Sequence, residues 1–179
     1  MADPRRALRG VAIAVGIVWL PIIAVWGPLP HALTFDDAWY YFQIARNVAG
    51  GRGSTFDGLH HTNGYHPLWL GICSLVYLAG FDGLAAVRAL LALQLAIWVA
   101  TAWRLATLLG TAVDGWAALR DRPDADRAGR RCTAVLVVVF ALLIGNPYVL
   151  KLYVNGMEST LVAFVSVVLL QIAVEVRAT

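Results

Sequence analysis

Long runs of apolar residues alternate with shorter polar segments along this chain. The four longest are Leu8–Trp26, Leu84–Leu109, Cys132–Ile144, which extends towards Tyr153, and Thr160–Val176. A helix of about 20 apolar residues crosses the hydrocarbon core of a bilayer, which is roughly 30 Å thick. We therefore predict four spanning helices, at about 8–26, 84–109, 132–150 and 160–176. The first lacks a clear small-residue cleavage site, so we expect an uncleaved signal anchor rather than a cleaved signal peptide.

A shorter apolar run, Pro67–Gly80, is ambiguous. As a helix it reaches roughly 21 Å, which is too short to span. If it did span, the segment 110–131 would lie outside with the five arginines at its end: Arg120, Arg122, Arg127, Arg130 and Arg131. Basic loops favour the cytoplasm. We therefore predict a re-entrant or interfacial helix at Pro67–Gly80, an outside loop at 27–83, a cytoplasmic loop at 110–131 and a cytoplasmic N-terminus.

Composition supports a membrane protein. Apolar residues make up 60% of the 179 residues and charged residues only 14%, well below the roughly 25% of soluble domains. Thirteen of the fourteen basic residues are arginines, and they cluster beside apolar runs, which fits membrane orientation rather than nucleic-acid binding. The two cysteines, Cys73 and Cys132, form neither a disulfide framework nor a metal-binding spacing.

The outside loop contains an amphipathic pattern that ends at Gly50 and Gly51. Thr34 or Asp36 is a suitable N-cap for this helix. Apolar positions share one face, namely Ala38, Tyr41, Phe42, Ala45, Val48 and Ala49, whereas Trp39, Tyr40, Gln43, Arg46 and Asn47 face elsewhere. We expect an interfacial helix with its aromatic residues at the depth of the lipid headgroups.

Adjacent carboxylates, Asp36 and Asp37, stand where this helix begins. Paired acids act as a general base, orient an acceptor hydroxyl or hold a divalent cation, although helix capping alone also explains them. Three histidines follow, His60, His61 and His66, without the spacing or the cysteines of a typical zinc site. No metal or cofactor is therefore indicated, and a divalent cation at the acid pair stays open.

Two further charged residues lie close to or within apolar surroundings. Arg88 lies about one turn into the second predicted span, where a phosphate or the acid pair would neutralise it, unless it snorkels to the headgroups. Glu158 lies in the predicted outside link between the last two spans, and an ordinary solvated turn explains it equally well. His66, which precedes Pro67, is placed to bind a phosphate or a sugar hydroxyl, or to cap the next helix.

Four segments carry a recognisable pattern: Asp-Asp-Ala-Trp-Tyr-Tyr-Phe-Gln-Ile-Ala-Arg-Asn from Asp36, Gly-Arg-Gly-Ser-Thr-Phe-Asp-Gly from Gly51, Thr-Asn-Gly-Tyr-His-Pro-Leu-Trp from Thr62, and Asn-Gly-Met-Glu-Ser from Asn155. The pattern resembles the N-terminal region of bacterial GT-C glycosyltransferases, which are multi-spanning enzymes that use polyprenyl-phosphate-linked sugars. The resemblance covers residues 8–176. It implies an all-α membrane fold of about four transmembrane helices, with interfacial helices in a large first extracytoplasmic loop.

The resemblance also implies an activity and a location. The chain would be part of a hexosyl- or pentosyltransferase of the inner or plasma membrane, with its active site outside and with Asp37 or Asp36 as catalytic base. We expect His66, Arg88, Asn63, Tyr65 and Glu158 to bind substrate. The donor would be a polyprenyl-phosphate sugar whose phosphate Arg88 and His66 neutralise, and the acceptor a glycan, lipid or protein. A single displacement with one base would invert the anomeric centre.

Other functions fit parts of the pattern. GT-C enzymes usually have more spans than this chain, so we expect residues 1–179 to be a single membrane domain from the N-terminal part of a larger module, or one chain completed by a second membrane chain. A non-catalytic membrane subunit of such an enzyme is the first alternative. A transporter or flippase component, with Arg88 and Gln94 along a path, is the second; it leaves the acid pair unexplained.

Overall fold

The computed structural model describes residues 3–118 and 125–178, and within them every regular element is an α-helix. The helices are α1 (Pro4–Val25), α2 (Leu29–Leu33), α3 (Asp36–Ala49), α4 (Pro67–Leu78), α5 (Gly83–Ala118), α6 (Ala125–Gly145), α7 (Pro147–Tyr153) and α8 (Ser159–Ala178). One isolated bridge, between Thr55 and His61, orders the loop that joins α3 to α4. The prediction of an all-helical chain is confirmed.

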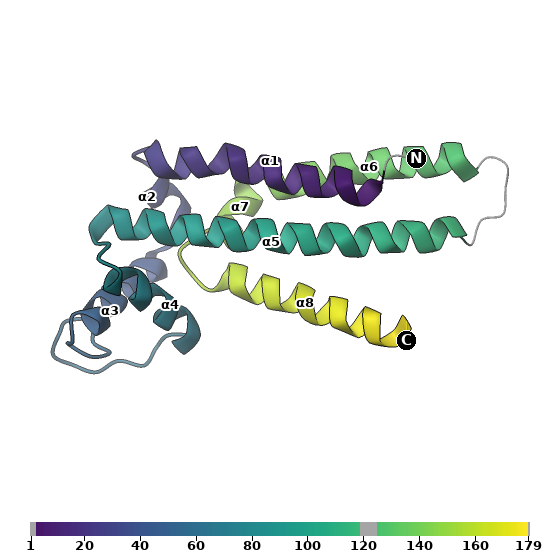
Figure 1. The fold of residues 1–179 in the computed structure, drawn as a ribbon. Helices are drawn as coiled ribbons and strands as arrows, with labels where there is room; N and C mark the ends of the chain where they lie inside the picture. The colour runs from purple at the N-terminus through teal and green to yellow at the C-terminus, as the bar shows by residue number, and fades with distance from the viewer. Residues whose placement is uncertain (1–2, 119–124, 179) are drawn as a thin grey trace.

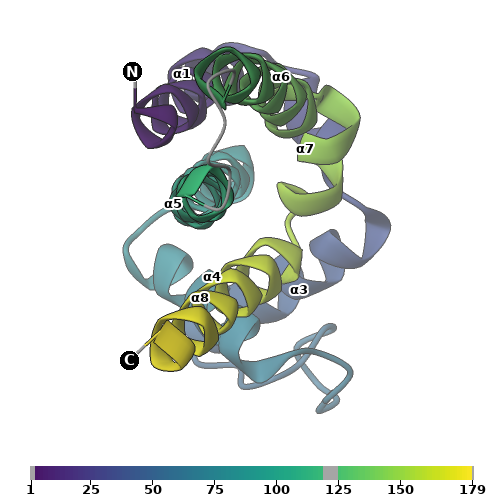
Figure 2. The same cartoon turned by 90° about the vertical axis from the view of Figure 1, so that its right-hand side faces the viewer.

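Long helices form a bundle with a smaller helical lobe at one end (Figure 1). α5 lies in the middle, with α1 and α6 along one side of it and α8 along the other (Figure 2). α3, α4 and the loop between them form the lobe, while the N-terminus, the C-terminus and the facing ends of α5 and α6 lie at the opposite end (Figure 1). The chain segments predicted to face one compartment therefore gather at one end of the bundle.

Three helices are long and apolar enough to cross a membrane: Pro4–Val25, Gly83–Val113 and Ser159–Val176. Arg131–Gly145 and Pro147–Tyr153 qualify together as a fourth, although they meet at a bend of 59°. Asn146 causes the break together with Pro147, because its side chain accepts a hydrogen bond of 2.8 Å from the backbone N–H of Tyr148 while proline begins a new helix. The structure thus has three or four helices suited to a bilayer, as expected for a membrane protein.

The helix ends extend into the segment 110–131 that the sequence predicted to be a loop. α5 continues to Ala118 and α6 begins at Ala125, so that of this segment only residues 119–124, together with their arginines Arg120 and Arg122, lie outside the described residues. Hydropathy marks where an apolar run stops, whereas a helix can continue into polar residues because its hydrogen bonds lie within its own backbone.

The amphipathic helix of the first loop is present as α3, and it ends at Gly50 as predicted. The predicted cap is wrong, because Phe35 occupies the N-cap position without a side-chain bond and Asp36 already belongs to the helix. The Thr34 hydroxyl instead donates to the carbonyl of Pro30 at 2.7 Å, at the end of the short helix α2. The predicted apolar face holds at Ala38, Tyr41, Phe42 and Ala45, which are all buried.

α4 is the short helix predicted around Pro67–Gly80. It has 12 residues, and Pro67 occupies its first turn. Its 12 residues reach only about 18 Å, too short for a span. α4 packs against α3, and Trp69 is its most deeply buried large side chain. A salt bridge of 2.7 Å between Arg46 and Asp82 joins the end of α3 to the start of α5.

Candidate functional site

An open cavity of about 350 Å³ lies where three separate segments meet. α3 contributes Asp37, the loop before α4 contributes Tyr65 and His66, and the link between α7 and α8 contributes Glu158. The remaining lining residues are Tyr40, Tyr41, Gly64 and Met157. The fold therefore brings together four residues that the sequence singled out. Three of them, Asp37, Tyr65 and His66, lie in the first loop region, and Glu158 lies more than ninety residues further along the chain.

Glu158 is the least exposed carboxylate of this cavity. Its Oε1 lies 3.5 Å from Nε2 of His66, and its side chain is 18% exposed against 67% for His66. Its Oε2 is buried and has no hydrogen-bond partner among the described residues. A buried carboxylate oxygen without a donor is costly, so this atom is suited to receive a proton.

Tyr41 of α3 also lines this cavity and contacts His66. Its hydroxyl accepts a hydrogen bond of 2.9 Å from the backbone N–H of His66, which holds the start of α4 over α3. Burial raises the pKa of Tyr41, and the negative charge of Glu158 raises it further. The phenol therefore keeps its proton at neutral pH and is available as a hydrogen-bond donor within the cavity.

The two acids at the start of α3 are exposed, and neither forms a hydrogen bond or ion pair within the described part of the chain. Asp37 lines the first cavity and also a second one of about 570 Å³, whereas Asp36 lines only the second. Both interact favourably with the helix dipole at the N-terminus of α3. Asp37 is the carboxylate that is accessible from both cavities.

Aromatic side chains form the walls of the second cavity. They are Trp39, Tyr40 and Phe56, and Gln43 completes the lining. Tyr40 stacks on Phe56 with ring centroids 5.0 Å apart, which keeps both rings in place beside the acids. Flat apolar faces beside carboxylate and amide groups suit a polyhydroxylated ligand, whose C–H faces pack on rings while its hydroxyls are hydrogen-bonded.

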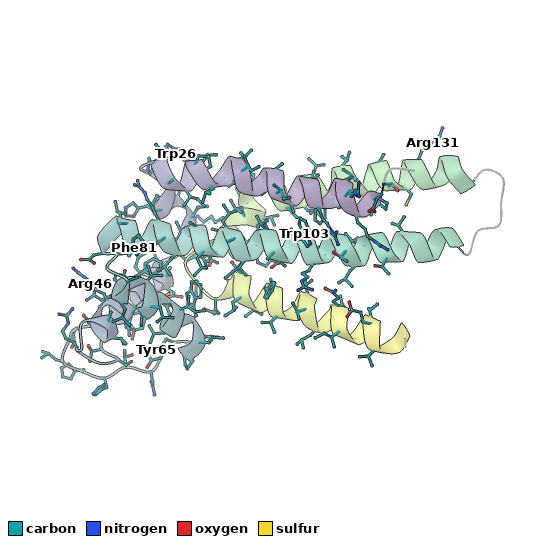
Figure 3. The ribbon with its side chains drawn as sticks, in the orientation of Figure 1. Trp26, Arg46, Tyr65, Phe81, Trp103 and Arg131 are labelled. Atoms are coloured by element: carbon teal, nitrogen blue, oxygen red, sulfur yellow. The ribbon has the colours of Figure 1, made fainter. Side chains whose placement is uncertain are left out.

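Hydrogen bonds to both backbone and side-chain groups hold the loop between α3 and α4. Ser54 Oγ donates to the carbonyl of Thr62 at 2.7 Å and lies 2.6 Å from the hydroxyl of Tyr65. The hydroxyl of Tyr40 lies 2.5 Å from Oγ1 of Thr62. These contacts hold Tyr65 in the lining of the first cavity. Figure 3 shows Tyr65 in the lobe.

Asn47 lies off the apolar face of α3, as predicted, but it is a buried structural residue. It is 2% exposed, and its Nδ2 donates to the carbonyls of Thr55 at 2.9 Å and Phe56 at 3.1 Å. Its Oδ1 accepts a hydrogen bond of 2.9 Å from Nε of Arg52. A polar residue in the last turn of a helix, directly before a glycine-rich turn, was the available signal for such a role.

The fully buried side chain of Gln94 in α5 forms two hydrogen bonds with the α7–α8 link, which contains Glu158. The Oε1 of Gln94 accepts from the backbone N–H of Gly156 at 2.8 Å, and its Nε2 donates to the carbonyl of Met157. Trp69 of α4 donates to the carbonyl of Gly156 at 2.9 Å. The sequence analysis considered Gln94 only as part of a transport path, so its role in positioning Glu158 was missed.

The two other predicted binding residues lie elsewhere. Arg88 is a half-buried residue of α5 whose Nε is buried without a partner in the described residues, and it lines neither cavity. Asn63 is exposed, and its backbone carbonyl accepts from the N–H of Tyr65 at 2.9 Å. Neither is brought into contact with the acid pair.

Metal-ligating residues do not gather in threes anywhere in the described ranges. His60 is instead paired with Asp57, whose Oδ2 lies 2.7 Å from Nδ1 of the imidazole. The hydrogen bond between the two side chains lowers the pKa of Asp57 and raises that of His60, and the attraction of the two charges adds to both shifts.

Comparisons with known proteins leave the family open. The functional assignment accordingly rests on the residues and contacts described above. No family model, no curated protein and no solved structure matches this chain.

Proposed function

We propose that the chain is the N-terminal part of a membrane glycosyltransferase that takes a sugar from a polyprenyl-phosphate donor, with Asp37 as its base. The observation that carries this proposal is the position of Asp37, a carboxylate without a partner in the described residues that lines two adjoining cavities. One cavity contains polar and acidic groups, and the other has aromatic walls. Two neighbouring compartments around one base suit a reaction between two substrates.

The chemistry follows from an exposed base beside a hydroxyl acceptor. Asp37 removes the proton of the acceptor hydroxyl as its oxygen attacks the anomeric carbon, and the bond from that carbon to the lipid phosphate breaks. The phosphate leaves with the bonding electrons and needs no general acid, because it is already a stable anion. The sugar is transferred with inversion, as a single displacement requires.

Three further residues orient the substrates without transferring a proton: Glu158, His66 and Tyr41. The carboxylate of Glu158, which lines the cavity, accepts a sugar hydroxyl, and the backbone N–H of His66 holds the Tyr41 phenol in place. Arg88, which has no counter-ion among the described residues, is available to the lipid phosphate from α5, outside both cavities. Because the phosphate is bonded to the anomeric carbon, this role requires the Arg88 guanidinium to reach the edge of the cavity that holds the sugar.

Substitution of the two acids tests the proposal directly. We expect Asp37→Asn to reduce transfer of a labelled sugar from polyprenyl-phosphate donors by about 10²-fold or more, as loss of a general base does. Asp36→Asn should have a smaller effect. Asp57→Asn is the matched control, since Asp57 is an acid of the same loop that lines neither cavity. Undiminished transfer by the Asp36→Asn/Asp37→Asn double variant would exclude the mechanism.

One observation favours a second candidate, a non-catalytic membrane subunit. Only 6% of the residues in the apolar window of α8 are buried within the bundle. The remaining surface of α8 is free to contact lipid or another membrane helix. A subunit predicts binding of a polyprenyl phosphate or of a partner chain with no sugar transfer by the purified protein. Transfer by the isolated chain, abolished in Asp37→Asn, would reject this candidate.

A further inference from the structure

A separate cavity of about 640 Å³ lies in the bundle between α1, α5 and α8. Two arginines line it, Arg9 from α1 and Arg104 from α5, together with Trp103, Thr107 and Gln171. The rest of its lining is apolar. Figure 3 shows Trp103 partway along α5, well away from Tyr65 in the lobe. This cavity therefore does not belong to the candidate active site.

Neutral groups hold both arginines in place. Arg9 donates from Nη2 to the hydroxyl of Thr107 at 2.9 Å, and its guanidinium carbon lies 4.9 Å from the ring centre of Trp103. Arg104 donates from Nη1 to Oε1 of Gln171 at 3.3 Å. The buried Nε of Arg9 has no hydrogen-bond partner in the described residues. Most of the N–H donors on these two guanidinium groups therefore remain available.

No acid of the described residues is paired with the two positive charges of this cavity. Within the described ranges neither Arg9 nor Arg104 forms an ion pair with an acid. Glu175, on the same helix as Gln171, is bonded to Nε2 of Gln171 at 2.8 Å instead of to an arginine. Two cations between apolar helices without counter-ions are costly, and an anion that enters the cavity would remove that cost.

The position along the helices indicates which anion has access. Arg9 lies about 26 Å along α1 from Trp26, and Arg104 lies about 32 Å along α5 from Gly83. Each distance is close to the roughly 30 Å thickness of the hydrocarbon core. If Trp26 and Gly83 lie at the membrane surface nearest the lobe, both arginines lie at the depth of the opposite headgroups. Trp103 is typical of that depth as well.

We propose that this cavity binds the phosphate of an anionic phospholipid in the leaflet opposite the lobe. The phosphate accepts hydrogen bonds from Arg9 and Arg104, and the glycerol backbone and the first carbons of its acyl chains lie against the apolar wall beside Phe164. The charge, the depth and the opening between membrane helices together select a lipid headgroup. The site is independent of the glycosyltransferase proposal, because it shares no residue with the lobe.

Native mass spectrometry of the purified chain in neutral detergent tests this site. Three probes are titrated separately: phosphatidylglycerol, phosphatidylcholine and inorganic phosphate. We expect one tightly bound phosphatidylglycerol and no comparable binding of phosphatidylcholine. Removal of one arginine should weaken binding about fivefold and removal of both about thirtyfold, given the usual contribution of a basic residue near an anionic lipid. The variants are Arg9→Gln, Arg104→Gln and their combination.

Arg6→Gln is the matched control, because Arg6 is an exposed arginine of α1 that does not line the cavity. Equal binding of phosphatidylglycerol by the double variant and the wild type would overturn the proposal. So would equal binding of the two lipids by the wild type, a result that needs no variant to fold. Displacement of the lipid by inorganic phosphate at similar concentration would replace the lipid site with a site for free anions.

Discussion

At the residue scale, the position of Glu158 depends on one glycine. Gly156 has a φ of 85°, in the region that favours glycine. A Cβ atom there would lie 2.6 Å from Cβ of Ala38 and 2.8 Å from Cζ of Phe42. The α7–α8 link therefore lies against α3 only because this residue has no side chain.

Gly156→Ala should accordingly destabilise the folded chain by about 2–5 kcal/mol, from left-handed backbone strain together with overpacking against α3. The measurement is thermal unfolding of the purified protein in detergent. Gly71→Ala is the matched control, since a Cβ at Gly71 meets nothing within 4 Å and its φ is unremarkable. Equal melting temperatures for the two variants would show that the link does not pack as described.

A pH dependence is expected in the exposed loop, from the pair of His60 and Asp57. The pKa of His60 is raised above its ordinary 6.5, so the contribution of the pair is complete below about pH 6.5 and is lost as the pH rises through the raised value. The pKa of Asp57 is lowered from its ordinary 3.8, so the contribution is complete above about pH 3.8 and is lost on acidification through the lowered value. The loop is then best ordered between those two limits.

Histidine NMR measures this directly. The imidazole of His60 should titrate above pH 6.5, and Asp57→Asn should move its pKa down, because the variant removes the charge that favours the imidazolium. His61→Gln assigns the signals without touching the pair. A pKa of His60 that is the same with and without the Asp57 carboxylate would contradict the contact.

The sequence predicted individual residues unevenly, for a physical reason. Asp37 was singled out as one of two adjacent acids at a helix start, His66 because it precedes Pro67, and Glu158 because it is a charged residue between two apolar runs. Gln94 and Asn47 were not understood, because their partners are backbone groups. A backbone N–H or carbonyl leaves no mark in the sequence, and those of Gly156 and Met157 lie more than sixty residues from Gln94.

At the element scale, the break between α6 and α7 is set by two adjacent residues. Pro147 has no N–H to continue the helix, and Asn146 supplies the cap of the next one. A double variant, Asn146→Leu/Pro147→Ala, removes both causes. We expect the two helices to merge and the 59° bend to decrease.

Spin labels at Leu142 and Leu152, which are both exposed, report on that bend. A straight helix places the two positions about 15 Å apart along its axis, and the bent wild type brings them closer. The distance should therefore increase in the double variant relative to the wild type. An unchanged distance would mean that packing against α1 and α8, rather than Asn146 and Pro147, imposes the break.

Elements were the part of this chain that its sequence predicted best. Apolar runs long enough for a bilayer correspond to α1, α5 and α8, because hydropathy and length are local properties. The two glycines after Ala49 ended α3 for an equally local reason. The cap of α3 was wrong because the N-cap position falls on Phe35, while the Thr34 hydroxyl donates to the carbonyl of Pro30 in a short helix that the sequence did not reveal.

At the scale of the whole molecule, the two ends of the bundle differ in charge and in structure. Arg131 lies at one end and Tyr65 in the lobe at the other (Figure 3). The positive-inside tendency assigns the Arg131 end to the cytoplasm. We therefore predict that the lobe lies on the extracytoplasmic side.

Cysteine labelling in intact cells tests that orientation. The native Cys132 is exposed and follows Arg131, so a membrane-impermeant maleimide should reach it only after the cells are opened. Leu59→Cys in a Cys132→Ser background should react in intact cells, because residue 59 is 80% exposed in the lobe. Cys73 is buried and provides a low background in both. Reaction of both sites from the same side would reject the orientation and, with it, an extracytoplasmic active site.

The hydrogen bonds of Gln94 to the α7–α8 link couple the membrane helix α5 to the lobe. Between Gly83 and Arg104 α5 extends about 32 Å, close to a hydrocarbon core of roughly 30 Å, so we expect α5 to tilt when the bilayer is thinner. Since Gln94 ties α5 to the link that bears Glu158, a change of tilt shifts that carboxylate relative to α3. Acyl-chain length should then alter the separation of His66 and Glu158, measurable by spin labels in thin and thick bilayers, and the composition of the host membrane becomes a regulator of this protein.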